Sequence, residues 1–111
     1  MAFQPMIKCD LVCADQNSAN RLLTLAQNAA AKRTIIQTVT DLQAMQWHNG
    51  RWIVTGILVF STQAEADAFY SEITSAYSQG PRANDILSGS DCIRFNRGDD
   101  GVDAEQYRTV K

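Results

Sequence analysis

The stretch "TIIQTVTDLQAMQWHNGRWIVTGILVF", residues 34–60, decides the fold of this chain. It contains two runs rich in β-branched and aromatic residues, separated by Asn49-Gly50. Asn-Gly between two such runs favours a hairpin, because both residues tolerate the positive φ of a type I′ turn. We therefore predict antiparallel strands over residues 34–47 and 51–60, joined by a turn at Asn49-Gly50.

The predicted turn also gives an interpretation of the only histidine in the chain, His48. A two-residue turn sets Trp47 opposite Trp52, which predicts an aromatic clasp on one face of the hairpin. His48 then lies opposite Arg51 at the solvated end. A second histidine and a nearby carboxylate to orient the ring are both missing from the sequence. We interpret His48 as a hairpin-tip residue and predict no metal site.

The same register predicts an irregularity in the middle of the hairpin. It would place the polar Gln43 on the face that carries Trp52. A β-bulge near Gln43 would turn Leu42 inward instead, and Gly56 on the opposite strand has the room to receive it. We predict a bulge at this point.

The residues before the hairpin predict a strand and then a helix. In "MIKCDLVC", residues 6–13, apolar residues alternate with others at the period of a strand. Asp15, Asn17 and Ser18 are candidate helix N-caps. The apolar residues that follow have helical spacing and end at the basic pair Lys32-Arg33, which suits a helix C-terminus. They are Ala19, Leu22, Leu23, Ala26, Ala29 and Ala30.

The residues after the hairpin predict a second helix and a last strand. Ser61 or Thr62 is the expected N-cap, and Gly80-Pro81 ends the helix. We expect "RANDILSGSD", residues 82–91, to be a loop and "CIRFN", residues 92–96, to be a short strand.

The order β-α-β-β-α-β predicts an α+β, ferredoxin-like sandwich. In this fold two helices cover one face of a four-stranded antiparallel sheet, and the first strand is central. A chain of 111 residues suits one domain. We place its core at about residues 6–97 and expect residues 98–111 to be a polar tail or an edge strand.

Composition narrows the functional classes. The net charge of −2 gives no general attraction to phosphate backbones, and the third strand lacks base-stacking aromatics, so we expect no nucleic acid partner. No apolar run reaches the ~18 residues of a membrane span. The N-terminus shows no secretory signal, so we expect a cytoplasmic protein. Cys9, Cys13 and Cys92 then act as small buried thiols, and a contact of Cys92 with either of the other two stays open.

One face of the predicted sheet has no helices over it. On the third strand, Trp52, Val54, Leu58 and Phe60 are expected to face the helices. The uncovered set is then Ile53, Thr55, Ile57 and Val59, with Met6, Lys8, Asp10 and Val12 on the first strand and Cys92, Arg94 and Asn96 on the last. A monomer would not normally leave such an apolar row in water, so we expect a second copy to cover it.

A cover over this face would also enclose charged side chains, which are costly to bury unless they are paired. One interpretation is an ion-pair network of Lys8, Asp10 and Arg94 at a dimer interface. The other is a polar patch in an apolar ligand pocket. In that second case the binding residues are Lys8, Asp10, Thr55, Ile57 and Arg94.

"ILVFSTQAEADAFYSEI", residues 57–73, is a strand followed by a capped helix with an aromatic pair. With the apolar pattern of residues 6–97, it resembles the dimeric α+β barrel group, which includes the antibiotic-biosynthesis monooxygenase-like proteins. The resemblance implies two sheets facing each other, with a pocket inside the barrel or between sheet and helices. Members of that group include cofactorless oxygenases, isomerases and haem-degrading enzymes. No motif is specific enough to carry a catalytic residue to this chain.

Three functions remain open at this point. The first is a homodimeric protein that binds a small hydrophobic ligand without a cofactor. The second is a cofactor-independent monooxygenase or isomerase, whose chemistry needs only an enclosed apolar cavity and one or two hydrogen-bond donors. The third is a module that binds another protein through the uncovered sheet face. The sequence does not decide whether the protein is an enzyme.

Overall fold

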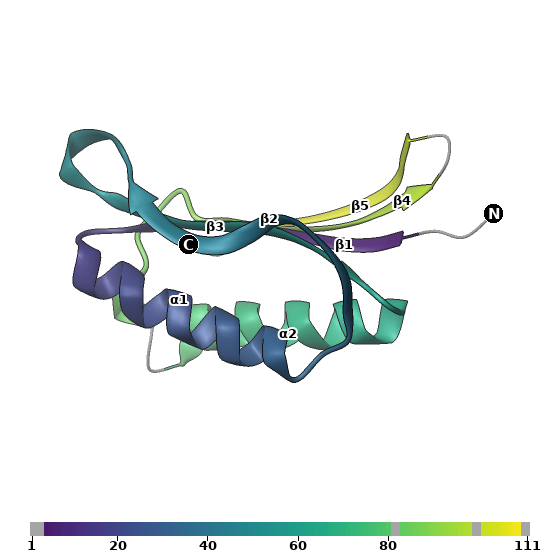
Figure 1. The fold of residues 1–111 in the computed structure, drawn as a ribbon. Helices are drawn as coiled ribbons and strands as arrows, with labels where there is room; N and C mark the ends of the chain where they lie inside the picture. The colour runs from purple at the N-terminus through teal and green to yellow at the C-terminus, as the bar shows by residue number, and fades with distance from the viewer. Residues whose placement is uncertain (1–3, 81–82, 99–100, 110–111) are drawn as a thin grey trace.

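The computed structural model describes residues 4–80, 83–98 and 101–109. Its elements follow one another in the order that the sequence predicts, with one further strand at the end (Figure 1). They are β1 (Gln4–Cys13), α1 (Gln16–Ala31), β2 (Ile35–Gln46), β3 (Trp52–Phe60), α2 (Gln63–Gln79), β4 (Asp91–Gly98) and β5 (Gly101–Thr109), with short 3-10 turns at His48–Gly50 and Ala83–Asp85.

The strands form an antiparallel sheet in the order β2-β3-β1-β4-β5, and both helices lie on one side of it (Figure 1). The order β2-β3-β1-β4 with two helices on one face is the ferredoxin-like arrangement, so the predicted fold is confirmed. β5 pairs with β4, so residues 101–109 are the edge strand that was one of the two expectations for the tail.

Each helix begins at a capping residue that the sequence contains. Of the three candidates before α1, Asp15 is the cap, and its Oδ1 accepts a hydrogen bond of 2.8 Å from the backbone N–H of Ser18. This bond lowers the pKa of Asp15, so its contribution to stability is lost as the pH falls through that lowered pKa. Thr62 caps α2, where its Oγ1 accepts from the backbone N–H of Glu65 at 3.2 Å.

The hydrophobic core fills the space between the sheet and the helices. At its centre the ring centroids of Phe60 and Phe69 are 5.1 Å apart and the rings are tilted, and this contact joins β3 to α2. Ile86 is also fully buried and lies beside Cys13 through an isolated β-bridge. Ile86 belongs to the segment predicted to be a loop, and the sequence gives no sign of its burial because one apolar residue in a polar segment has no periodicity.

The hairpin turn contains Asn49-Gly50 as predicted, with φ values of 61° and 73°. However, three residues separate the paired Trp47 and Arg51, and Gln46 is the residue opposite Trp52. A shift of one residue moves side chains to the other face of a strand. The predicted clasp between the two tryptophans is therefore wrong: Trp52 packs against the core, whereas Trp47 contacts His48 with ring centroids 4.3 Å apart.

The predicted bulge in β2 is confirmed. The pairing with β3 shifts between Thr40 and Gln43, and Leu42 packs against the core. A Cβ added to Gly56 would lie 2.6 Å from Leu42 Cδ2, so the Leu42 side chain occupies the space that Gly56 leaves free. Two further shifts, between Ile35 and Gln37 and between Thr38 and Thr40, were not predicted.

Candidate functional site

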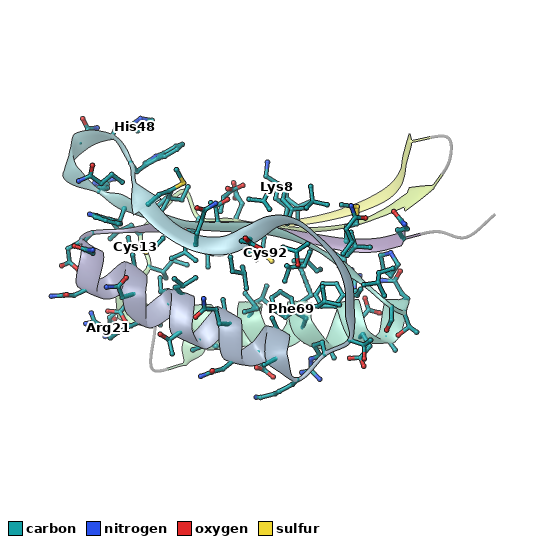
Figure 2. The ribbon with its side chains drawn as sticks, viewed as in Figure 1. Lys8, Cys13, Arg21, His48, Phe69 and Cys92 are labelled. Carbon is teal, nitrogen blue, oxygen red and sulfur yellow. The ribbon has the colours of Figure 1, made fainter. Side chains whose placement is uncertain are left out.

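The face of the sheet opposite the helices, here called the open face, brings together four of the five predicted binding residues. The pairing of β1 with β3 sets Lys8 against Ile57 and Asp10 against Thr55. Their neighbour Leu11 is fully buried under the helices, so strand alternation directs Lys8 and Asp10 to the other side. Figure 2 shows Lys8 pointing away from the helices. The predicted placement of these four residues is confirmed.

Lys8, Asp10 and Thr55 form a connected polar cluster at the middle of the open face. The hydroxyl of Thr55 donates to Asp10 Oδ1 at 2.9 Å, and Lys8 Nζ lies 3.6 Å from Asp10 Oδ2. The side chains of Lys8 and Asp10 are 43% and 33% exposed. Both oxygens of Asp10 are therefore engaged, whereas an ammonium group has three donors and the one contact to Asp10 leaves capacity for another acceptor.

Apolar side chains flank this polar cluster along β1 and β3, whereas Gln43 of β2 lies opposite Thr55 and Asp91 of β4 lies opposite Asp10. The strands and register of these apolar side chains place them on the open face, and three of them are already buried in the single chain: Met6, Ile53 and Val59, at 3%, 5% and 1% exposure. Val12 and Ile57 are half-buried. The apolar row that the sequence predicts on β3 therefore exists, and Ile53 and Val59 within it are buried.

The exposed apolar surface lies mainly along β2. In the part of the chain that the structure describes, the large hydrophobic residues with exposed side chains are Ile36, Val39, Met45 and Trp47, at 57%, 45%, 45% and 44% exposure. Met45 is paired with Ile53, which places it on the open face. β2 is also an edge strand, and its three register shifts disfavour pairing with a further strand. The irregular edge of β2 is thus poorly suited to the addition of another strand.

Arg94, the fifth predicted binding residue, lies on the other face of the sheet. β4 pairs with β1 so that Arg94 is opposite the core residue Ile7. Its guanidinium forms an ion pair with Asp67 on α2 and lies 5.2 Å from the centre of the Tyr70 ring. The predicted placement of Arg94 on the uncovered face is wrong.

The error arises from the alternation of β4. With Cys92, Arg94 and Asn96 predicted on the uncovered face, Ile93 and Phe95 are expected on the face toward the helices. In the structure Cys92 is the core residue, fully buried beside Cys9, and Ile93 is opposite Lys8 on the open face. Arg94, two residues after Cys92, therefore lies on the same face as Cys92. When the two alternating sets of residues in a short strand have similar polarity, the sequence does not reveal which set faces the core.

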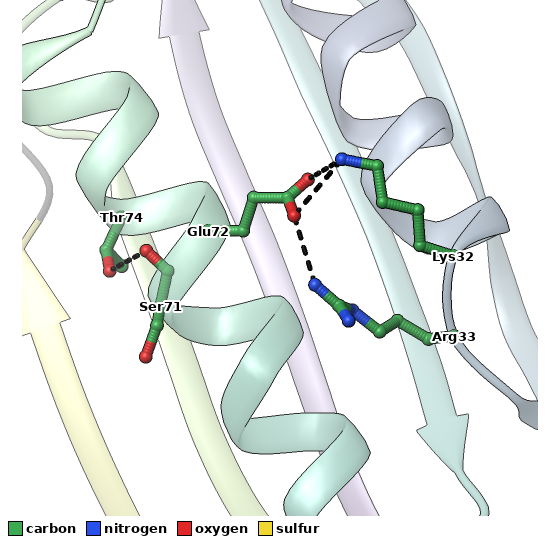
Figure 3. Close-up of polar contacts among 5 residues, drawn as sticks. All are labelled: Lys32, Arg33, Ser71, Glu72 and Thr74. Carbon is green, nitrogen blue, oxygen red and sulfur yellow. Dashed lines mark hydrogen bonds and ion pairs between the residues drawn. The ribbon is translucent and has the colours of Figure 1, made fainter.

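The described residues on the helix side of the molecule line clefts. One, of about 490 Å³, follows α1 beside α2 and is bordered by Arg21, Lys32 and Glu72. Glu72 forms ion pairs with both Lys32 and Arg33, at 3.2 Å and 3.0 Å, which join the C-terminal end of α1 to α2 (Figure 3). Arg21 is paired with Asp85 at 2.6 Å, so each of these cations has a carboxylate partner within the chain.

The second cleft, of about 440 Å³, lies between α1 and the bulged part of β2. Its apolar lining includes Ile35, Leu42 and Leu58, and Asp41 lies at its border. The register shifts in β2 occur at this cleft, so the cleft lies where the pairing of the strand is irregular.

His48 lies at the exposed tip of the hairpin, as predicted. Among the described residues, no group of three or more His, Cys, Asp or Glu side chains is arranged to hold a metal ion. Neither of the two helices in the described ranges has the length and apolar character that crossing a membrane requires.

No family model matches the chain, and no curated protein matches it. Among solved structures, the chain is similar to the de novo designed protein LFR1 1, which has a ferredoxin fold and was determined by solution NMR. The two share 12% sequence identity over 91% of this chain and 89% of the designed one, with a TM-score of 0.46.

Proposed function

We propose that this protein is a homodimer that binds a small, mainly hydrophobic ligand between two open faces, in the manner of a dimeric α+β barrel. The observation that carries the proposal is the polar cluster of Lys8, Asp10 and Thr55, flanked by apolar side chains along β1 and β3. Ligand sites combine apolar walls with a few fixed polar groups in this way.

The polar cluster favours a ligand with an acceptor oxygen. Asp10 accepts a hydrogen bond of 2.9 Å from Thr55 and forms an ion pair of 3.6 Å with Lys8 Nζ, which favours a position of the ammonium beside the carboxylate. A carbonyl or carboxylate group of a ligand would accept from the remaining Lys8 donors. Ile57 lies beside Lys8 in the sheet register and would form the apolar floor. Arg94 has no part in this site, because its guanidinium is paired with Asp67 on the helix side.

A second copy of the chain is the partner proposed for the open face, because charges of both signs lie there. The described side chains of that face include the cation Lys8 and two carboxylates, Asp10 and Asp91, which are opposite each other on β1 and β4. A two-fold axis through this part of the face would bring Lys8 of each copy toward the carboxylates of the other. The ends of the sheet also curve away from the helices, so the open face is framed by the β2–β3 and β4–β5 hairpins (Figure 1). Met45 and Trp47 would add apolar contacts at the hairpin.

Non-denaturing mass spectrometry of the purified chain tests both parts of the proposal in one measurement. We expect a dimer with a retained small molecule. Lys8→Met should reduce the retained fraction at least about tenfold, because it removes the donors that face the ligand. The matched control is Lys32→Met, which removes an equally flexible cation from the helix layer, where its side chain is 61% exposed. That variant should retain the ligand.

The possible results separate the two parts of the proposal. A dimer without any retained molecule, and with no affinity for a panel of apolar carboxylates, would contradict the ligand and keep the dimer. A monomer would contradict both and would favour a different protein as the partner of the open face.

A further inference from the structure

Cys9 and Cys92 lie directly opposite each other on the neighbouring strands β1 and β4. Their Sγ atoms are 3.7 Å apart, although the two residues are 83 positions apart in the sequence. Both are free thiols on the helix side of the sheet, with 1% and 0% exposure. The sequence left open whether Cys92 would contact Cys9 or Cys13, and the structure places it beside Cys9.

This geometry suits a disulfide with little movement of the backbone. Opposed residues of antiparallel strands have Cα atoms about 4.5 or 5.5 Å apart, and both values lie in the range of about 4.4–6.8 Å found for disulfides. The sulfur atoms would have to approach from 3.7 Å to about 2.0 Å, which side-chain rotation can supply.

Cys13 provides a comparison within the same strand. It is also a buried free thiol, but it is paired with Trp52 on β3 and lies beside Ile86, and its thiol donates to the carbonyl of Leu11 at 3.6 Å. Neither Cys9 nor Cys92 is its partner in the strand pairing. Burial raises the pKa of Cys13 to about 12. Cys13 is therefore a thiol of similar burial without a partner for a bond.

We propose that Cys9 and Cys92 are an oxidation site, at which a peroxide converts the two thiols into a disulfide that ties β1 to β4. One sulfur, as its thiolate, attacks a peroxide oxygen, the O–O bond breaks, and a sulfenic acid and water result. The second sulfur then displaces the hydroxyl of the sulfenic acid as water. In total, hydrogen peroxide and two thiols give one disulfide and two waters, so the peroxide accepts the two electrons that the sulfurs lose.

Because both thiols are buried, the disulfide should form slowly and should also be reduced slowly. The thiolate is the reactive form, and the contact with Cys92 together with burial raises the pKa of Cys9 well above its usual value. Oxidation therefore requires β4 to separate briefly from β1, and the disulfide, once formed, is shielded from reductants. Because the bond joins residues 83 positions apart, it restricts the unfolded chain and stabilises the folded one. Once formed, the disulfide therefore persists after exposure to a peroxide and keeps the folded chain stabilised.

The test is treatment of the reduced, full chain with hydrogen peroxide, followed by unfolding, alkylation and peptide mapping. We expect one alkylated thiol, at Cys13, and a linked pair of peptides that contain Cys9 and Cys92. The thermal midpoint should rise by at least about 5 °C. Oxidation should be faster in a urea concentration below the unfolding transition, because strand opening limits the rate.

Two variants serve as controls. Cys13→Ser should still form the link and show the same rise in midpoint, whereas Cys92→Ser should show neither. If Cys92→Ser does not fold, the peptide map of the unaltered chain decides the question on its own. Three alkylated thiols after oxidation, a link that includes Cys13, or sulfinic acid at Cys9 would each overturn the proposal.

Discussion

The two faces of the same β-sheet differ in how fully the chain itself buries them. On the helix side, large side chains such as Phe60 and Phe69 are completely buried, and ion pairs such as Arg33–Glu72 lie at the border of the core. On the open face a lysine, an aspartate and a threonine occupy the centre of the same strands. Since β1 and β3 supply both faces, strand alternation alone separates a packing surface from a candidate binding surface.

This difference indicates where a substitution should affect folding and where it should affect association. Residues on the helix side contact two layers of one chain, so their loss should appear in the free energy of unfolding. On the open face, Lys8 and Asp10 keep 43% and 33% of their side chains exposed, so the loss of these side chains should appear mainly in binding.

The largest effect on stability should come from Phe69→Ala on the helix side. The side chain is fully buried and stacks on Phe60, so its removal leaves a cavity between α2 and β3. We expect a loss of about 3–5 kcal/mol in the free energy of unfolding, measured by urea denaturation. A loss below about 1 kcal/mol would show that the core is not organised around this pair.

Gly56→Ala should cost less, about 1–3 kcal/mol, through overpacking. The new methyl group would lie 2.6 Å from Leu42 Cδ2 and 3.0 Å from Leu42 Cα, so β2 would have to shift. The sharper measurement is a double-mutant cycle with Leu42→Ala. Gly56→Ala should be less destabilising in that background, and purely additive effects would argue against the bulge.

Arg94→Ala tests on which face this residue acts. It removes a partly exposed ion pair with Asp67 and the contact with Tyr70, so we expect a loss of about 1 kcal/mol. Oligomeric state and any ligand binding should be unchanged, whereas Lys8→Ala should alter them. The reverse result, with association lost in Arg94→Ala and kept in Lys8→Ala, would contradict the assignment of faces.

The smallest effect should come from Trp47→Ala. Its side chain is 44% exposed and contacts His48 instead of Trp52. We expect a loss of less than about 1 kcal/mol, and a larger one for Trp52→Ala, whose side chain packs against the core. Equal and strongly coupled losses would mean that the two tryptophans are in contact after all.

The sequence was sufficient to predict the fold and much of the candidate site. Two local patterns in the sequence are strong. The turn residues Asn49-Gly50 predict a hairpin, and the alternation with a period of two in β1 predicts a strand and its two faces. The same alternation correctly placed Lys8, Asp10, Thr55 and Ile57 together.

The failures concern features that depend on a single residue. One extra residue in the hairpin turn moved Trp47 away from Trp52, and the phase of the short strand β4 was inverted. An isolated apolar residue such as Ile86 belongs to no periodic pattern, so the sequence gives no sign that it is buried. In each case packing against distant residues, which the local sequence does not encode, determines the outcome.

The most direct test of the central claim is sedimentation velocity of the unaltered chain and of Ile57→Asp. Ile57 is half-buried on the open face beside Lys8, so a carboxylate there should disrupt a contact between sheets and leave the helix side intact. We predict that the unaltered chain sediments as a dimer and that the variant sediments as a folded monomer, with circular dichroism confirming its fold. A variant that stays dimeric, with an unchanged sedimentation coefficient, would contradict the claim that the open face is the interface.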